Sequence, residues 1–172
     1  MTFKLPLYLL VLASLIMSLN LASAADKPKF KSYQVKAVYV FRIANFVHWQ
    51  NEADMQTLRF CVEGNEQVKK TLLSLLVGKE IRGLALQVSN ELNANCDVAF
   101  ISAIDSVSPL AKYGPSTLTI GDSADFTSLG GAIQLQTKGK RIKPLINLTN
   151  TSKADYVIGS SLMRIAKLEG VK

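Results

Sequence analysis

Residues 96–102 have the sequence Cys96-Asp97-Val98-Ala99-Phe100-Ile101-Ser102, with four consecutive apolar residues at the centre. An apolar run without polar alternation is typical of a strand that is buried on both faces of a parallel sheet. Strand-like and helix-like segments alternate around this run. They predict strands at 58–62, 84–88 and 118–120, and amphipathic helices at 32–47, 68–78 and 107–113. This β-α-β-β-α-β order predicts an α/β three-layer sandwich with a mixed, mostly parallel central sheet.

The last third of the chain predicts a hairpin followed by a helix. Two segments with strand character, 132–137 and 141–148, flank Lys138-Gly139-Lys140, which predicts a hairpin at one edge of the sheet. A helical turn is predicted at 152–156. The last helix is expected to begin with Ser160 or Ser161 as its N-cap, and its apolar periodicity extends through Leu168.

Residues 1–24 have the pattern of a signal peptide. An apolar run from Leu5 to Leu19 is followed by Ala22-Ser23-Ala24, the small residues that signal peptidase recognises, so cleavage is expected before Ala25. An uncleaved membrane anchor is the alternative, but the run falls short of the roughly 20 residues that a spanning helix needs. We therefore expect residues 25–172 to form one exported domain.

The chain has a formal net charge of +7, from 20 Lys and Arg residues against 13 Asp and Glu residues. These charges are scattered rather than grouped, and export separates the protein from nucleic acid, so no nucleic-acid partner is expected. A solvated surface is the ordinary interpretation of such a balance. Attraction to an anionic membrane or to an acidic protein surface is the alternative.

Cys61 and Cys96 are the only cysteines. An even pair in an exported chain predicts one disulfide, which would close a loop of about 36 residues and stabilise the fold by roughly 4 kcal/mol. A redox switch or a metal pair is the alternative. The sequence has no C-x-x-C motif, and its single histidine cannot complete an ordinary zinc site with two cysteines.

Patterns typical of catalysis, cofactors or metals are lacking in the sequence. His48 is the only histidine, and no G-x-S-x-G, H-E-x-x-H, G-x-G-x-x-G or P-loop pattern occurs. The turn Glu63-Gly64-Asn65-Glu66 joins a predicted strand to a predicted helix, but its glutamates would repel phosphate. We expect a non-enzymatic protein without cofactor or metal, and a hydrolase that uses His48 is the weaker alternative.

Two groups of residues are candidates for binding a protein partner. Phe46 and Trp49 form an aromatic pair at the end of the first predicted helix, where they would anchor a partner if exposed and close the core if buried. The basic tip of the predicted hairpin, which includes Lys140 and Arg141, would dock an acidic partner or simply be solvated.

Several blocks resemble one family when they are taken together. Tyr33-Gln34-Val35-Lys36-Ala37-Val38-Tyr39 followed by Phe46-Val47-His48-Trp49 resembles the opening helix of the YfiR-like periplasmic proteins. Further blocks match in order: Phe60-Cys61-Val62-Glu63-Gly64, residues 96–102, Gly130-Gly131-Ala132-Ile133, Ile146-Asn147-Leu148 and Ser160-Ser161-Leu162. The resemblance covers nearly all of the chain after the predicted signal peptide.

The resemblance implies a compact α/β regulator of the bacterial periplasm that is often dimeric. The best understood members repress a membrane diguanylate cyclase by binding its periplasmic sensory region, and Cys61 and Cys96 match cysteines that pair in the family. The chain departs from the pattern in two places. It lacks the second cysteine pair of some members between Gly130 and Asn147, and Pro144-Leu145 replaces the usual aromatic-acidic pair.

The leading hypothesis is therefore a non-enzymatic periplasmic regulator. It would bind and repress the sensory region of a membrane signalling protein, most simply a diguanylate cyclase. The alternative is a small-molecule sensor that uses the crevice outside the carboxyl ends of the strands.

Overall fold

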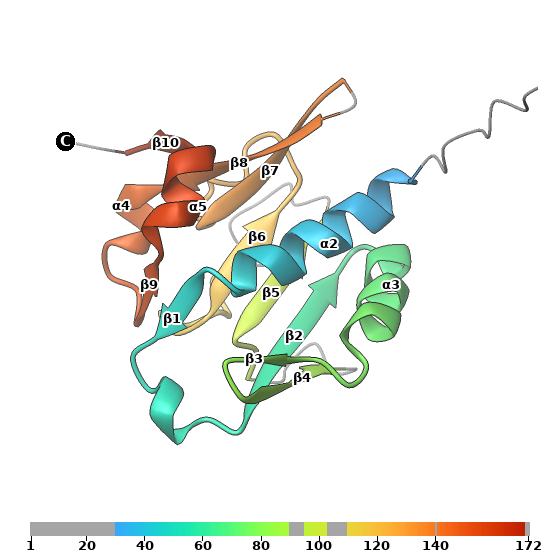
Figure 1. The fold of residues 1–172 in the computed structure, drawn as a ribbon. Helices are drawn as coiled ribbons and strands as arrows, with labels where there is room; N and C mark the ends of the chain where they lie inside the picture. The colour runs from blue at the N-terminus through green and yellow to red at the C-terminus, as the bar shows by residue number, and fades with distance from the viewer. Residues whose placement is uncertain (1–29, 90–94, 103–109, 140, 171–172) are drawn as a thin grey trace, which may run out of the picture.

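The computed structural model describes residues 30–89, 95–102, 110–139 and 141–170. In these residues the main sheet has eight strands in the order β10-β8-β7-β6-β5-β2-β4-β3 (Figure 1). The strands are β2 (Thr57–Glu63), β3 (Glu80–Ile81), β4 (Leu84–Val88), β5 (Val98–Ile101), β6 (Leu118–Gly121), β7 (Ile133–Lys138), β8 (Arg141–Asn147) and β10 (Lys167–Glu169). The predicted signal peptide lies outside the described residues.

The sheet is mixed and mostly parallel, as predicted. Strands β4, β2, β5, β6 and β7 pair in parallel, whereas β3 with β4 and β7 with β8 are antiparallel. The predicted hairpin is present as β7 and β8, but the expectation that it forms an edge is wrong. Strand β10 pairs in parallel with the outer side of β8 and becomes the edge itself.

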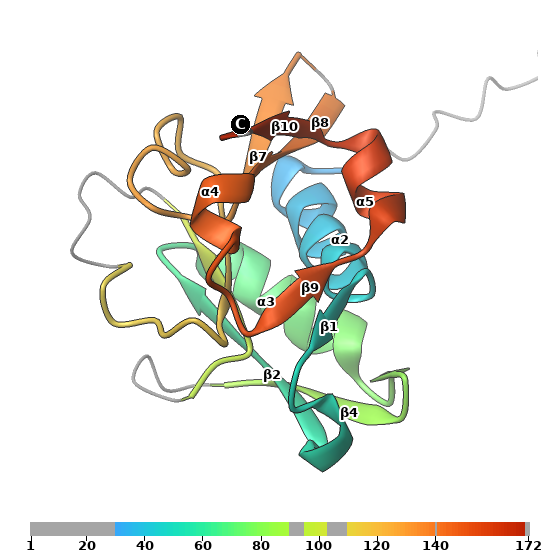
Figure 2. The ribbon, with the colours of Figure 1, turned by 90° about the vertical axis from the view of Figure 1, so that its left-hand side faces the viewer.

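Helices α2 (Ser32–Ala44) and α3 (Glu66–Leu76) cover one face of the sheet (Figures 1 and 2). Strand β5 is buried on both faces, as its apolar run predicts: Val98 and Phe100 face the helices, whereas Ala99 and Ile101 belong to a smaller cluster on the opposite face. Helix α3 begins where Asn65 accepts a hydrogen bond from the Val68 N–H at 3.0 Å. Such an N-cap satisfies one of the donors that a helix start leaves without a partner.

The third layer covers the opposite face with turns in the part of the chain that the structure describes (Figure 2). The predicted helix at 107–113 lies partly outside the described residues, and its described part, 110–113, forms turns. Phe126 fills this layer and is fully buried between two glycines. A Cβ on Gly121 or Gly131 would lie 2.1 Å from the Phe126 ring, so neither position has room for a side chain.

The first helix is shorter than predicted, because it ends at Ala44 rather than at 47. Residues Val47–Trp49 instead form strand β1, which pairs antiparallel with β9 (Tyr156–Ile158) in a separate two-stranded sheet. The predicted helical turn at 152–156 is also misplaced. The short helix α4 (Leu148–Thr151) comes earlier, and Tyr156 already belongs to β9. For Val47–Trp49, pairing with the distant strand β9 outweighs the helical spacing of the apolar residues in 32–47.

The last helix also differs from the prediction at both ends. Helix α5 (Ser160–Ile165) has Gly159, not a serine, at its N-cap, and Leu168 belongs to β10. The Gly159 N–H donates a hydrogen bond to the Phe46 carbonyl oxygen at 2.7 Å. A Cβ at Gly159 would lie 2.9 Å from the same oxygen, so the close approach of the two segments requires glycine there.

The Phe126 packing predicts that Gly131→Ala is strongly destabilising. The new methyl group would overlap the ring, and a shift of the ring would disturb the small cluster beneath it, so the free energy of unfolding should fall by about 3 kcal/mol. Chemical denaturation measures the change. Gly114→Ala is the matched control, because a Cβ at Gly114 meets no atom within 4 Å. Equal stability of the two variants would contradict this account of the third layer.

Candidate functional site: an apolar groove and a disulfide on opposite faces

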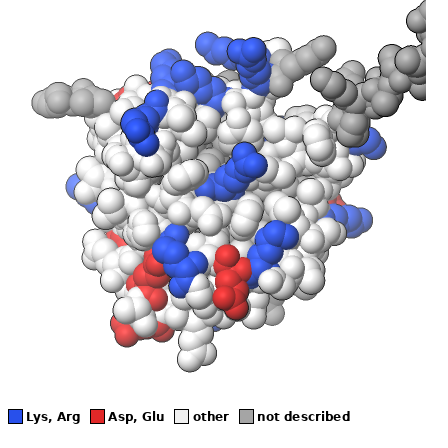
Figure 3. All heavy atoms as spheres, in the orientation of Figure 1, with Lys and Arg blue, Asp and Glu red and all other residues white. Residues whose placement is uncertain are grey.

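An apolar groove lies between α2, α5 and β8 on the face that Figure 3 shows. Its lining runs along α2 from Val38 to Ile43, continues through Asn45 and Phe46 just after the helix, and includes Pro144 of β8 and both Leu162 and Ile165 of α5. It encloses about 400 Å³ and is lined mainly by carbon. A concave apolar surface of this size is the usual form of a binding site in a protein.

The groove exists because three segments that are distant in sequence are held close together. Helix α2 buries Val40 and Ile43 against the sheet, and the Tyr39 hydroxyl donates a hydrogen bond to the Ile142 carbonyl oxygen on β8 at 2.8 Å. The Gly159 contact with Phe46 then brings the start of α5 against the end of α2. These contacts set the separation of the groove walls.

The aromatic pair of the sequence is divided between core and surface. Trp49 is 4% exposed, and its indole N–H donates to the Ser116 carbonyl oxygen at 2.9 Å, so it closes the core. Phe46 is 36% exposed and lines the groove. Of these two aromatic residues, only Phe46 therefore has the exposure that partner binding requires. Its role in binding stays a prediction.

Of the predicted basic contact pair, Arg141 is not part of the groove lining. Arg141 is exposed at the start of β8, and Lys140 lies outside the described residues. His48 is exposed on β1, with its Nδ1 atom 3.9 Å from a Glu52 carboxylate oxygen. Contributions of Lys140 and Arg141 to binding stay predictions.

Arg82 joins the end of α2 to the β3–β4 turn. Its guanidinium donates to the carbonyl oxygens of Asn45 at 3.1 Å and Val47 at 2.7 Å, and to both carboxylate oxygens of Glu52 at 2.5 and 2.9 Å. The Arg82 hydrogen bond holds the pKa of the Glu52 carboxyl below its usual range. Arg82 has a φ of +50°, and Gly83 follows it with a φ of +83°, as a tight hairpin turn demands.

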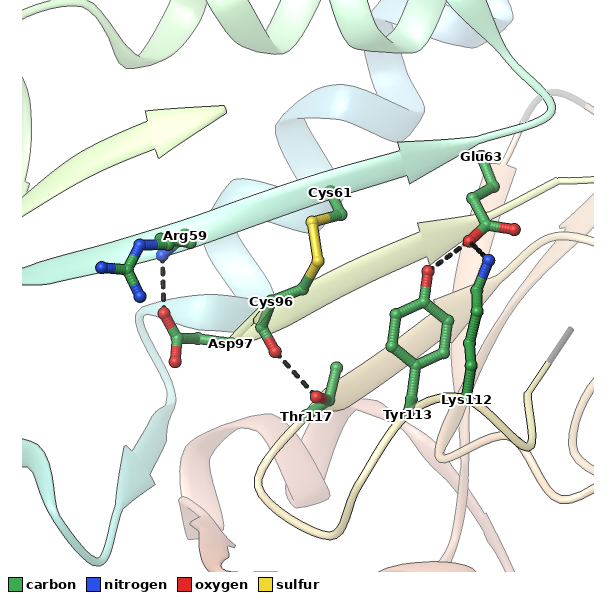
Figure 4. Close-up of a disulfide and its surroundings, with 8 residues drawn as sticks. All are labelled: Arg59, Cys61, Glu63, Cys96, Asp97, Lys112, Tyr113 and Thr117. Carbon is green, nitrogen blue, oxygen red and sulfur yellow. Dashed lines mark hydrogen bonds and ion pairs between the residues drawn. A yellow bond between two sulfur atoms is a disulfide. The ribbon is translucent and has the colours of Figure 1, made fainter. Parts of the chain in front are cut away.

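The predicted disulfide links Cys61 of β2 to Cys96, which lies two residues before β5 (Figure 4). The two Cα atoms are 5.8 Å apart, and both residues are buried. Cys61 alternates with Phe60 and Val62, which face the helices, so the disulfide lies on the opposite face, under the turn layer. It therefore reinforces the face that has little helical cover.

Polar contacts surround the disulfide. Asp97 accepts a hydrogen bond from the Arg59 N–H at 2.7 Å, while burial raises the pKa of the Asp97 carboxyl. Thr117 donates to the Cys96 carbonyl oxygen at 2.7 Å. At the far end of β2, Glu63 accepts a hydrogen bond from the Tyr113 hydroxyl at 2.5 Å and pairs with Lys112 (Figure 4). Glu63 thus anchors the turn layer.

The carboxyl ends of the parallel strands carry another polar group. Lys36 of α2 pairs with Asp122 at 2.6 Å, and the Ser102 hydroxyl donates to the same carboxylate oxygen at 3.1 Å. Ser102 follows β5 and Asp122 follows β6, where the sensor hypothesis places a ligand. In the described ranges, no cluster of three or more His, Cys, Asp or Glu residues is arranged to hold a metal ion. None of the helices in those ranges has the length and apolar character needed to cross a membrane.

Sequence reasoning missed three residues that shape the groove. Ile165 belongs to the apolar periodicity of the longer helix that the sequence predicts, but it is the last residue of α5 and is 60% exposed. Gly159 and Arg82 act through contacts with segments more than 30 residues away, which no local pattern indicates. The Arg82-Gly83 pair at a strand-to-strand junction was the one available signal, for a tight turn.

The fold and the site define a class: an α/β domain with a mostly parallel sheet, stapled by a disulfide beneath one face and grooved on the other. The sequence model of the YfiR/HmsC-like family matches residues 33–167, and the chain belongs to this family. Family membership indicates a periplasmic regulator of cyclic di-GMP signalling that works through a sensor partner. A search of curated proteins finds no match to the chain.

The buried disulfide predicts a large stability difference. Replacing both Cys61 and Cys96 by alanine removes the link that spans 35 residues of sequence and should lower the free energy of unfolding by about 4 kcal/mol. Urea denaturation of the two proteins measures it. Reductant is the control, because it should lower the midpoint of the wild-type protein and leave the variant unchanged. A variant as stable as the oxidised wild type would contradict the structural role.

The Arg82–Glu52 contact predicts a pH-dependent loss of stability. Because the folded-state pKa of Glu52 is below its ordinary value of 4.5, the contact stabilises the fold above that pH and is lost as pH falls through the folded-state pKa. Glu52→Gln should cost about 1.5 kcal/mol at pH 7 and less at pH 3. Unfolding free energies measured across this range test it against Glu80→Gln, the same change at an exposed site. A constant difference between Glu52→Gln and wild type from pH 7 to pH 3 would disprove the linkage.

Proposed function

We propose that this protein is a non-catalytic periplasmic regulator that binds the periplasmic sensory region of a membrane diguanylate cyclase and represses the cyclase. The family match over residues 33–167 is the observation that carries the proposal. The signal peptide predicted from residues 1–24 supports it, because an exported protein contacts only the outward-facing parts of membrane proteins.

The absence of catalysis in this proposal rests on the chemistry of the side chains. His48, the only histidine, is exposed, and the carboxylate nearest to it, Glu52, is held by Arg82 rather than positioned to orient an imidazole. The two cysteines are joined in the disulfide and provide no thiolate. The Ser102 and Ser116 hydroxyls donate hydrogen bonds to the carboxylates of Asp122 and Asp155, rather than to the imidazole that activates the serine of a catalytic triad.

The alternative, a small-molecule sensor, has weaker support. Its site would be the crevice at the carboxyl ends of the strands, but Lys36 and Ser102 both donate hydrogen bonds to Asp122 there. A ligand would have to replace these contacts. The apolar groove, by contrast, presents exposed side chains without rearrangement. A homodimer stays a prediction, and the molar mass of the purified mature protein in solution would test it.

The proposed function predicts that deletion of the gene raises the cyclic di-GMP level and biofilm formation, because the cyclase loses its repressor. Mass spectrometry of cell extracts measures the nucleotide. Expression of the full chain should restore the low level, whereas residues 25–172 without the signal peptide should not, since that form stays in the cytoplasm. Unchanged cyclic di-GMP in a deletion strain that contains the cognate cyclase would rule out the proposal.

A further inference from the structure

Large apolar side chains are exposed to solvent on both walls of the groove between α2 and α5. Phe46 is 36% exposed on one wall and Ile165 is 60% exposed on the other. Contiguous exposed apolar side chains around a concavity mark a surface that another molecule covers.

The charges around the groove indicate what kind of molecule covers it. Arg42 lines the groove, makes no ion pair with the described residues, and is exposed. The lining includes no aspartate or glutamate. Figure 3 shows the same separation, with acidic side chains gathered in the lower part of this face and mainly Lys and Arg above them.

The length of the groove sets the size of the occupant. From Val38 to Ile43 the lining follows α2 for five residues, or about 7.5 Å at 1.5 Å per residue, and it continues past the end of the helix through Asn45 and Phe46. This length suits one to two turns of a partner helix, which would place two apolar side chains on the floor at positions i and i+3 or i+4. An Arg42 that is unpaired among the described residues, beside an apolar floor without carboxylates, suits a helix that carries acidic residues beside those anchors.

We infer that the α2–α5 groove binds an amphipathic helix with an acidic flank in the periplasmic region of the membrane partner. Phe46 and Ile165 grip the apolar face of the helix, and Arg42 pairs with its carboxylates. This inference rests on the proposed function for the existence of a membrane partner, and it adds the surface and the chemistry of the contact.

Site-specific photo-cross-linking in the host cell tests where the groove makes contact. A photoreactive phenylalanine analogue is placed at Phe46 or Ile165 in the full chain, and at Leu73 or Val77, which are exposed on the α3 side, as matched controls. The groove positions should cross-link to an acidic helical segment in the periplasmic region of a membrane protein, and the controls should not. Cross-links from the groove to a second copy of this chain, to lipid or to nothing would each overturn the inference.

Charge reversal tests the role of Arg42. The probe is the purified periplasmic region of the membrane protein, titrated with the mature chain. Arg42→Glu should raise Kd at least about tenfold and Arg42→Lys far less, whereas Lys70→Glu, an equal charge change on exposed α3, should leave Kd unchanged. Thermal unfolding of the variants establishes that they fold. Equal Kd values for Arg42→Glu and Lys70→Glu would overturn the inference.

The two proposals fail in different ways. If deletion raises cyclic di-GMP but Arg42→Glu still binds and represses fully, the function stands and the groove inference fails. If deletion leaves cyclic di-GMP unchanged while the groove positions cross-link to an acidic helix of another membrane sensor, the groove inference stands and the cyclase assignment fails.

Discussion

The burial of β5 on both faces is the constraint on which the rest of the structure depends. Its side chains alternate between two apolar clusters, so each face of the sheet needs its own cover. Helices α2 and α3 supply a large cluster on one face. On the other, the described cover consists of turns with a small cluster around Phe126, and turns bury less apolar surface than a helix does.

The disulfide and the glycines make the turn-covered face stable enough to hold the sheet. Cys61–Cys96 lies on that face and ties the middle of β2 to the segment that leads into β5. Gly121 and Gly131 let the Phe126 ring sit directly against the backbone, and Glu63 anchors the turns through Tyr113 and Lys112. Covalent and polar contacts thus supplement a small apolar cluster, a solution that an oxidising compartment permits.

The accuracy of the sequence predictions followed the range of the interactions involved. The run at 98–101 identified β5 with its bounds, and the strand-turn-strand pattern identified the β7–β8 hairpin, because local composition dominates there. Strands β1, β9 and β10 have three residues each and exist through pairing with distant segments, so no periodicity reveals them. For the same reason the exposure of Ile165 was not predictable. The groove lies between α2 and α5, which are separated by more than 100 residues, so local sequence patterns do not predict it.

The same long-range contacts that escape sequence analysis make the groove rigid. The end of α2 is held by Gly159 at the Phe46 carbonyl, by Arg82 at the Asn45 and Val47 carbonyls, and by the pairing of β1 with β9. Helix α5 cannot move away from α2 without breaking the Gly159 contact. A surface whose walls are fixed before binding loses little conformational entropy when it is covered, so more of the contact energy is available for affinity. A rigid groove of this kind suits a regulator that must bind one conformation of its partner and not another. A rigid surface cannot change its shape to fit the second conformation.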